Sequence, residues 1–158
     1  MTTNIQPFSA IQQTTDLVTS DRWFEYPVHA YPHHTDYAGV VWHGAYVSWM
    51  EEARVEYLRL LGVKFSDLVD LGCDLPVVDL QVRYHRAIQM GMSAVVRTRM
   101  NKMSGVRMTW DYKIQSPDGQ DTYVTAQVVL VPVDREKGKI MRRLPANIEE
   151  ALVKLSMS

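Results

Sequence analysis

The sequence predicts an α+β domain in which a five-stranded antiparallel sheet wraps around one long central helix. Three observations support this class. Apolar residues recur at helical spacing from Tyr46 to Leu61, which indicates one buried helical face. From Val78 onward, apolar and polar residues alternate, as in strands that bury one face. Ser-Pro-Asp-Gly at 116–119 is typical of a tight turn between antiparallel strands.

The elements follow in a simple order. Residues 23–30 alternate as a strand, and Pro27 places that strand at an edge or a bulge. The long helix covers 44–61 and ends at Gly62, and 64–71 suggest a short helix capped by Ser66. Four strands joined by tight turns, and therefore antiparallel, follow. They cover 78–85, 94–101, 106–115 and 124–130, with a turn at Gly91, and Pro145 starts a last helix over 146–155.

The composition fits one globular domain: the chain has 158 residues, of which 46% are hydrophobic, and a net charge of −1. With that charge and no recognised motif, we expect no nucleic-acid binding. We expect residues 1–20, rich in Thr and Gln, to be a flexible arm and residues 21–158 to be a single domain. A single cysteine, Cys73, and the lack of a signal-like start or an 18-residue apolar run favour a cytoplasmic protein without membrane partners.

The stretch before the long helix carries the candidate chemistry. Pro32 and Gly39 mark a loop, and the carboxylate of Asp36 lies in it. The free N–H groups at the helix start, around His43 and Gly44, carry partial positive charge and can stabilise an oxyanion. A carboxylate beside a helix start is a candidate hydrolytic site, although D-x-x-G also occurs in ordinary turns.

The residues of this stretch resemble a known family. Asp36-Tyr-Ala-Gly-Val-Val-Trp-His-Gly-Ala-Tyr46, followed by Glu51-Glu-Ala-Arg54, resembles the 4-hydroxybenzoyl-CoA thioesterase family of hotdog-fold enzymes. The resemblance covers about residues 22–150 and implies hydrolysis of an acyl-CoA thioester. It implies that Asp36 is the catalytic carboxylate and that the backbone N–H of His43 polarises the thioester carbonyl. The His43 side chain either takes part in catalysis or only completes the helix start.

The resemblance also bears on substrate contacts and assembly. It places the turn Lys102-Met103-Ser104-Gly105 near the CoA arm. It implies a site formed between two subunits, in dimers that commonly pair into tetramers. Tyr46 and Glu51 are further substrate-binding candidates, and Trp42 either lines an acyl pocket or packs structurally. Residues 84–92 lack the Pro-Ala pair and the Asp that many members carry there, so the acyl contacts of that segment do not carry over.

Two mechanisms fit this assignment. A thiolate leaves without much acid assistance, so the reaction needs a nucleophile or base and a stabilised oxyanion. Asp36 either attacks the carbonyl to form a mixed anhydride or deprotonates the attacking water. Two other functions remain open: cleavage of an acyl group from a carrier protein, and non-catalytic binding of acyl-CoA.

The other charged and metal-ligating residues have simpler interpretations. Adjacent histidines on an extended segment point in opposite directions, so we expect His33 and His34 to hold no metal. CoA is part of the substrate, and no cofactor is needed. Glu51 is a reserve catalyst or the (i, i+3) partner of Arg54. Two basic sets remain. Arg83, Arg97, Arg99, Arg107 and Lys113 suggest a solvated face or tetramer contacts, and Arg135, Lys137, Lys139, Arg142 and Arg143 are candidates for the CoA phosphates.

Overall fold

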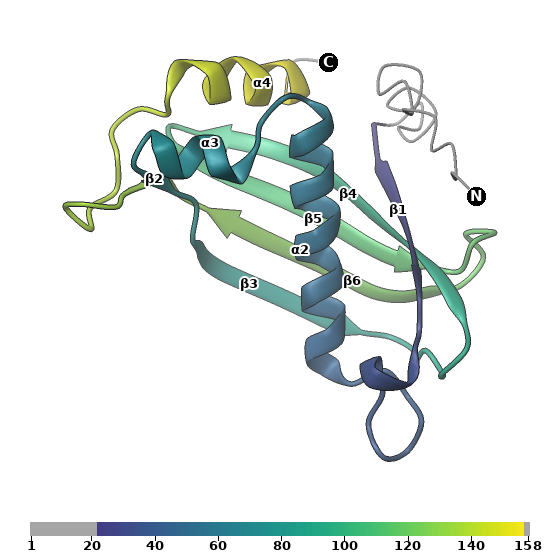
Figure 1. The fold of residues 1–158 in the computed structure, drawn as a ribbon. Helices are drawn as coiled ribbons and strands as arrows, with labels where there is room; N and C mark the ends of the chain where they lie inside the picture. The colour runs from purple at the N-terminus through teal and green to yellow at the C-terminus, as the bar shows by residue number, and fades with distance from the viewer. Residues whose placement is uncertain (1–21, 157–158) are drawn as a thin grey trace, which may run out of the picture.

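The structure is a computed structural model that describes residues 22–156, shown in Figure 1. The arm expected at residues 1–20 lies outside the described residues. In chain order the elements are β1 (Phe24–His29), the 3₁₀ turn η1 (Pro32–His34), α2 (His43–Leu60), α3 (Phe65–Asp70), β2 (Cys73–Asp74), β3 (Val77–Tyr84), β4 (Ser93–Ser104), β5 (Arg107–Gln115), β6 (Thr122–Leu130), β7 (Val133–Asp134) and α4 (Ala146–Ser156).

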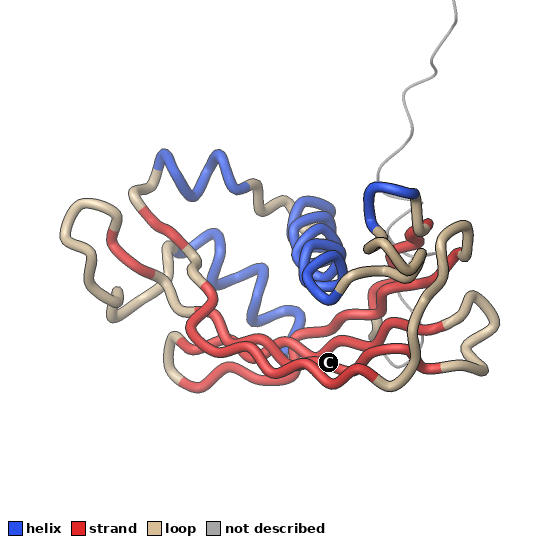
Figure 2. The backbone as a smooth tube through the Cα atoms, turned by 90° about the horizontal axis from the view of Figure 1, so that it is seen from below, coloured by secondary structure: helices blue, strands red, loops and turns tan. Residues whose placement is uncertain are grey.

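The predicted architecture is confirmed. Five antiparallel strands form one sheet in the order β1-β4-β5-β6-β3. Figure 2 shows α2 lying across one face of this sheet, with the other helices on the same side. The turns after β4 and β5 join neighbouring strands, as their Gly-containing sequences predict.

One predicted connection is wrong. β3 pairs with β6 at the sheet edge and not with β4, so no tight turn joins paired strands at Gly91. Gly91 does turn the chain, with φ +89°, but the segment between β3 and β4 bonds to the loop before α2. The Val41 amide donates to Ile88 O, and the Met90 amide donates to Gly39 O. The alternating pattern fixed the strands without showing which of them are neighbours.

The core lies between α2 and the inner face of the sheet. Phe24 of β1 stacks on Tyr57 of α2, with ring centroids 4.6 Å apart and planes within 3°. The predicted inner rows of the central strands are buried, which removes apolar surface from water and stabilises this layer. The largest fully buried side chains include Met50, Leu58, Met108, Trp110, Tyr112, Ile114 and Leu130.

The edge strand β3 departs from its predicted burial. Val78, Leu80 and Tyr84 retain 49%, 42% and 47% exposure, although the pattern places them on a buried face. α2 covers the middle of the sheet and leaves this edge partly open. The result is an apolar strip beside a strand with only one neighbour.

A small ribbon closes the end of the sheet at which β3 begins. β2 pairs with β7, and the Arg135 amide donates to Gly72 O, so this ribbon is fixed to the end of α3. The sequence pattern predicted neither strand. α3 begins after Lys64, and Ser66 lies inside it, so the predicted Ser66 cap is wrong. Within residues 22–156 no helix has both the length and the apolar character that crossing a bilayer requires.

Candidate active site

The loop before α2 is a closed hairpin. Thr35 and Val41 form a β-bridge, and the Asp36 amide donates to Val40 O at 2.9 Å. The Gly39 amide donates to Asp36 O at 3.1 Å, and Gly39 has φ +77°, a conformation that favours glycine. The glycine of the D-x-x-G motif is therefore needed to close this loop.

The carboxylate of Asp36 is exposed, and only one of its two oxygens accepts hydrogen bonds from the loop. Its Oδ1 accepts hydrogen bonds from the amides of Ala38 at 2.8 Å and Val40 at 3.4 Å. Within the described part of the chain, no group donates to Oδ2. The loop thus fixes one oxygen and leaves the other available to a substrate or a water molecule.

The segment after β3 holds this loop against α2. Besides the two backbone bonds to residues 39–41, the Ile88 amide donates to the hydroxyl of Tyr46 at 3.2 Å. Tyr46 is buried, and this burial raises the pKa of its phenol. Tyr46 therefore serves as a brace between the helix and the segment in which the chain departs from the family pattern.

The start of α2 presents unused donors. Trp42 is the N-cap residue, and no side chain caps the helix. Among residues 22–156, no protein acceptor receives the amides of His43 and Gly44, while the Ala45 amide donates to Trp42 O. These two N–H groups lie at the positive end of an 18-residue helix and suit an anionic oxygen.

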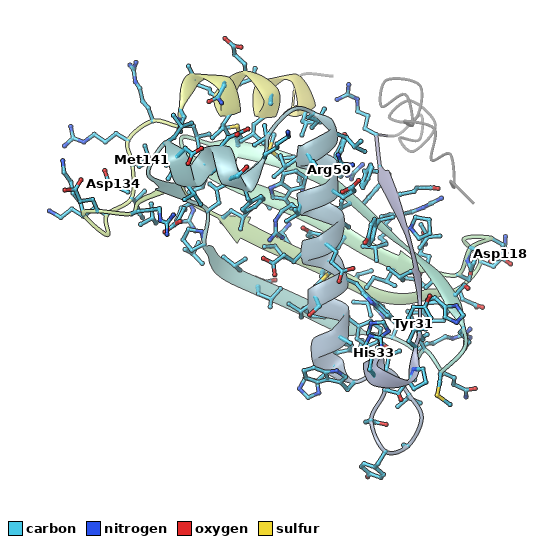
Figure 3. All side chains as sticks on the ribbon, viewed as in Figure 1. Tyr31, His33, Arg59, Asp118, Asp134 and Met141 are labelled. Carbon is cyan, nitrogen blue, oxygen red and sulfur yellow. The ribbon has the colours of Figure 1, made fainter. Side chains whose placement is uncertain are left out.

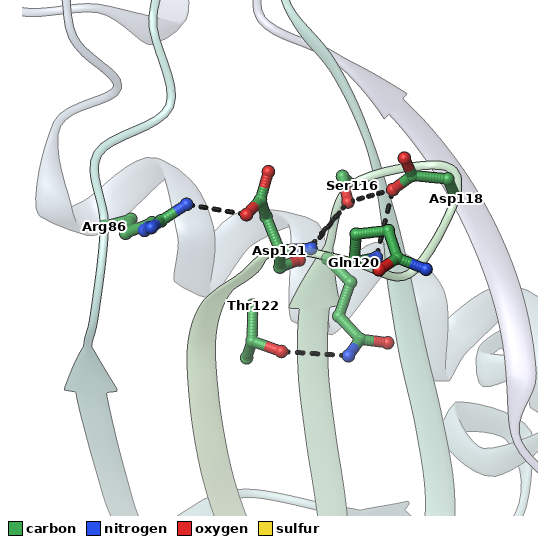
Figure 4. Close-up of polar contacts among 7 residues, drawn as sticks. Arg86, Ser116, Asp118, Gln120, Asp121 and Thr122 are labelled. Atoms are coloured by element: carbon green, nitrogen blue, oxygen red, sulfur yellow. Dashed lines mark hydrogen bonds and ion pairs between the residues drawn. The ribbon is translucent and has the colours of Figure 1, made fainter.

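A cleft lies at the start of α2 and is lined by His43, one of these two donors. It has a volume of about 240 Å³ and is lined by Val41, His43, Tyr46, Tyr84, His85, Arg86 and Ala87. The Tyr84 hydroxyl donates to His43 O at 2.9 Å and joins the end of β3 to the helix start. Figure 4 shows Arg86 pairing with Asp121, 2.6 Å away, in the turn before β6. Asp36 lies in the adjoining loop and is not part of this lining within one chain.

Trp42 packs on the side of the helix start. A Cβ at Gly44 would lie 2.1 Å from Cη2 and 2.2 Å from Cζ3 of the Trp42 indole. The ring therefore occupies the space of a side chain at Gly44, so any larger residue there would have to displace the ring. Trp42 is also half exposed and meets the His43 ring edge-on, with centroids 5.2 Å apart.

Other predicted residues lie elsewhere in the chain. The turn Lys102–Gly105 lies at the end of the sheet where β3 begins, because Met103 pairs with Met108, which is in register with Leu130 and Val77. Tyr84 and the start of α2 mark the other end. One chain therefore does not bring this turn to Asp36.

Glu51 and Arg54 border a small apolar cavity of about 110 Å³ beside β3. Arg54 is 4% exposed, and its guanidinium donates to the Tyr112 hydroxyl at 2.8 Å. No ion pair joins Glu51 to Arg54 in the described part of the chain, so that predicted pair is wrong. The pair on this helix is Glu56–Arg59, with 2.6 Å between Oε1 and Nη2. The pattern predicted the helix but not that Arg54 enters the core.

The histidines before α2 form an aromatic cluster. The rings of His33 and His34 are 4.0 Å apart, and His34 meets Trp49 edge-on at 5.2 Å. Burial, followed by the charge of His33, lowers the pKa of His34. Figure 3 shows Tyr31 and His33 beside the start of α2. Across the described residues, no group of three or more His, Cys, Asp or Glu side chains has the arrangement of a metal site.

A larger open groove, of about 590 Å³, lies on the β1 side of α2. Its walls include Tyr26, His29, Tyr31, His34, Trp49 and Glu52. No local motif marks this groove, because its walls come from four separate segments of the chain. It does not contain the free amides at the start of α2.

Comparison with known proteins agrees with this geometry. The sequence profile of the thioesterase-like superfamily matches residues 31–154. The Synechocystis sp. protein sll0410, which carries the name of an esterase, is 53% identical over 91% of this chain and 86% of its own length. The acyl-CoA thioester hydrolase YbgC of Escherichia coli is 30% identical over 79% of this chain and 92% of its own. The DHNA-CoA thioesterase structure from Staphylococcus aureus superposes with a TM-score of 0.77 at 30% identity, covering 84% of this chain and 89% of that one.

The fold and the helix start thus define a hotdog-fold enzyme of the thioesterase class. The chain belongs to the thioesterase-like superfamily, which confirms the resemblance inferred from the motif at residues 36–54.

Proposed function

We propose that the protein hydrolyses an acyl-CoA thioester to the free acid and CoA. The observation that carries this proposal is the pair of free amides of His43 and Gly44 at the start of α2, where His43 lines an open cleft. The loop that holds Asp36 adjoins this cleft and is fixed by backbone bonds to residues 88–90. Relatives named as acyl-CoA thioester hydrolases, with coverage of most of both chains, support the same reaction.

In the proposed reaction, the thioester carbonyl oxygen accepts hydrogen bonds from the His43 and Gly44 amides. These donors stabilise the negative charge that develops as the carbonyl carbon becomes tetrahedral. The Asp36 carboxylate either attacks this carbon, so that CoA thiolate leaves and water opens the anhydride, or takes a proton from the attacking water. Both paths need the carboxylate in its ionised form, and both give one carboxylic acid and one CoA.

We assign the nearby side chains to positioning. Tyr46 and Tyr84 form walls of the cleft, and Tyr84 also fixes the first carbonyl of α2. Trp42 offers an exposed ring beside the free amides and suits an acyl chain or an aromatic acyl group. Glu51 is the reserve carboxylate, two turns into the helix.

We infer that the active unit is a dimer that pairs through β3. β3 has eight residues, no Pro or Gly, and an exposed apolar strip, whereas the other edge strand, β1, contains Pro27, which has no N–H to donate. A second copy that extends the sheet would cover Val77, Leu80 and Tyr84. Assembly of two such dimers into a tetramer remains a prediction from the resemblance.

Charge selects the register of this dimer. A two-fold axis perpendicular to the sheet keeps both α2 helices on the same face of the joined sheet. If this axis passes beside Gln81, so that Gln81 pairs with the partner's Gln81, then Asp79 of each subunit lies opposite Arg83 of the other, which gives two ion pairs. Shifting the centre to Leu80 or Val82 loses both ion pairs. Among the described residues neither Asp79 nor Arg83 has an ion-pair partner within the chain.

This antiparallel pairing also accounts for the turn Lys102–Gly105. The turn lies at the end of the sheet where β3 begins, and antiparallel pairing turns that end of one subunit toward the start of α2 in the other. The site would then be formed between two subunits, with the turn supplied by the partner.

The proposal is tested by assaying the protein against aromatic, medium-chain and long-chain acyl-CoAs, with Asp36→Asn beside the wild type. Asn keeps the shape and removes the charge, so we expect kcat to fall at least about 100-fold. Asp70→Asn is the matched control, since it neutralises an exposed carboxylate on α3, away from the loop. Full activity of Asp36→Asn, or no turnover of any acyl-CoA by the wild type, would contradict the proposal.

Two further measurements separate the open alternatives. Rates on acyl-CoA and on the same acyl group carried by an acyl-carrier protein identify the preferred thioester. His43→Ala keeps the backbone N–H and removes the imidazole, so a kcat within about threefold of the wild type assigns the role to the amide alone. A larger loss assigns a role to the side chain.

A further inference from the structure

The open groove on the β1 side of α2 takes no part in the proposed reaction. Its volume, about 590 Å³, falls within the range of ordinary small-molecule sites. β1 and β3 are the two edges of the sheet, and Figure 1 shows them on opposite sides of α2. The groove therefore stays open when two copies pair through β3, and neither His43 nor Gly44 lines it.

One wall of the groove is a connected set of aromatic rings. The ring centroid of Tyr31 lies 4.9 Å from that of His29 and 5.7 Å from that of His34. His34 in turn meets Trp49 edge-on at 5.2 Å. His33, which does not line the groove, stacks on Tyr31 with centroids 5.8 Å apart. These contacts hold the Tyr31 ring in place, although 53% of this residue is exposed.

A carboxylate sets the charge of the groove. Among the described residues that line it, Glu52 is the only Asp or Glu, and there is no Lys or Arg. The Tyr26 hydroxyl donates to Oε2 of Glu52 at 3.2 Å, and within residues 22–156 no cationic group lies within 4.0 Å of this carboxylate. Burial lowers the pKa of His34, so that ring is neutral at pH 7. The groove thus carries a negative charge beside aromatic walls.

We propose that this groove binds an organic cation, in which an amine, amidine or quaternary ammonium group is joined to a flat or apolar body. The cationic group lies against the carboxylate of Glu52, and the body lies on the ring of Tyr31. A carboxylate that no cation of the chain neutralises favours a positively charged ligand, and the faces of aromatic rings attract cations as well. The site is additional to the proposed thioester site and does not depend on it.

β1 and β4 supply the apolar surface for the body of such a ligand. Val28 pairs with Ala94 and Pro27 pairs with Val95 in the strand register, and all four residues line the groove. Covering this surface gives a ligand with an apolar body a binding free energy that a bare ammonium ion lacks. The phosphates of CoA would meet the charge of Glu52 without a Lys or Arg to offset it, so the groove does not suit the thioester substrate.

The first test compares benzamidine with benzamide, which has the same shape but no charge. The amidinium group can pair with a carboxylate through two parallel hydrogen bonds, and the ring can lie on Tyr31. In an NMR titration of the full chain we expect saturable binding of benzamidine, with shifts at His29, Tyr31 and Glu52. Benzamide should bind at least about fivefold more weakly. Equal affinities for the two probes, or no saturable binding of benzamidine, would overturn the proposal.

The second test removes the charge of the groove. Glu52→Gln keeps the length of the side chain and an oxygen that can accept from Tyr26, so we expect benzamidine to bind about fivefold more weakly and benzamide to bind as before. Glu149→Gln is the matched control, because it neutralises an exposed carboxylate on α4. If both variants lose benzamidine affinity equally, or if neither loses it, the assignment to Glu52 is wrong and the proposal falls.

The third test examines the aromatic wall with benzyltrimethylammonium, a cation that has no hydrogen to donate. Tyr31→Leu keeps an apolar side chain and removes the ring face, so we expect this probe to bind about two- to fivefold more weakly. Tyr37→Leu changes a fully exposed tyrosine outside the groove and should leave the affinity unchanged. An unchanged affinity in Tyr31→Leu would contradict the proposal, because the ring face would then contribute nothing.

Cation binding and hydrolysis are measured separately. Asp36 does not line the groove, so benzamidine should bind Asp36→Asn as tightly as it binds the wild type. If the protein hydrolyses acyl-CoA but binds neither cation, the groove site is refuted and the proposed function stands. If it binds the cations through Glu52 but hydrolyses no acyl-CoA, the proposed function is refuted and the groove site stands.

Discussion

The hydroxyl of Tyr84 donates a hydrogen bond to the carbonyl oxygen of His43 over 2.9 Å and so ties the last residue of β3 to the first residue of α2. We expect Tyr84→Phe to loosen the helix start and lower kcat/KM about three- to tenfold, while the free energy of unfolding falls by about 1 kcal/mol at most. Kinetics and urea unfolding on the same preparation measure the two effects. Tyr31→Phe, another exposed tyrosine outside the cleft, should change neither; equal activity in both variants would refute a positioning role for Tyr84.

A methyl group at Gly44 should displace the Trp42 ring, because its Cβ would lie 2.1 Å from the indole. The ring is half exposed and can rotate away, so we expect Gly44→Ala to change stability by less than about 1 kcal/mol but to alter substrate binding. The difference in fluorescence between this variant and Gly44→Ala/Trp42→Phe reports the ring. If Trp42 fluorescence and KM both match the wild type, the packing described here is wrong.

The buried contact between Arg54 and Tyr112 should be visible as an energetic coupling. Tyr112→Phe removes the acceptor that the guanidinium uses, so we expect a loss of about 1.5–3 kcal/mol. Arg54→Met removes the buried cation, and in that background Tyr112→Phe should cost much less. A double-mutant cycle from urea unfolding gives the coupling, and strictly additive losses would show that the hydrogen bond contributes nothing.

Burial raises the pKa of Tyr57 and Tyr112 above their ordinary value of about 10. The unfolded chain ionises these phenols first as the pH rises, so it then binds fewer protons than the native protein, and stability must fall with pH. The contribution is complete below pH 10 and is lost above it. Urea unfolding between pH 8 and 11 should show a smaller decline in the free energy of unfolding for Tyr57→Phe than for the wild type. An identical decline in both proteins would exclude Tyr57 as a source of the pH dependence.

The charge pattern of β3 predicts how dimer formation responds to mutation. Arg83→Asp places two carboxylates opposite each other in the inferred register, so the dimer should weaken by about 1 kcal/mol or more for each of the two contacts. Adding Asp79→Arg restores opposite charges and should restore the dimer. Light scattering across a dilution series measures the mass, and unchanged association in all variants would contradict the register centred on Gln81.

Local signals in the sequence were sufficient for the element types and for most of the fold class. The helix over His43–Leu60 and the buried rows of β4, β5 and β6 follow from periodicity, because one face of each element must leave water. The loop glycine, Gly39, was readable because its backbone conformation excludes most other residues. The candidate site was readable as a motif, since Asp36, His43 and Gly44 lie within one short stretch.

The remaining features depend on contacts between distant residues. Periodicity could not place β3 beside β6, because a strand's pattern states which face is buried and not which neighbour it has. It could not show that Arg54 enters the core to meet Tyr112, 58 positions away. The cleft also depends on distant contacts. Residues 84–87 line it beside the start of α2, and the segment that follows them is bonded to the loop before α2 through Ile88 and Met90.

The sequence by itself determined the helix, the alternating strands and the loop that holds Asp36, because each follows from the preferences of residues close together in the chain. Only the tertiary structure decided that Tyr84 meets His43, that the apolar side of β3 stays open, and that the turn Lys102–Gly105 lies at the other end of the sheet from Tyr84. The physical reason is that these arrangements depend on which surfaces pack together once the chain has folded. Sequence spacing does not record those surfaces.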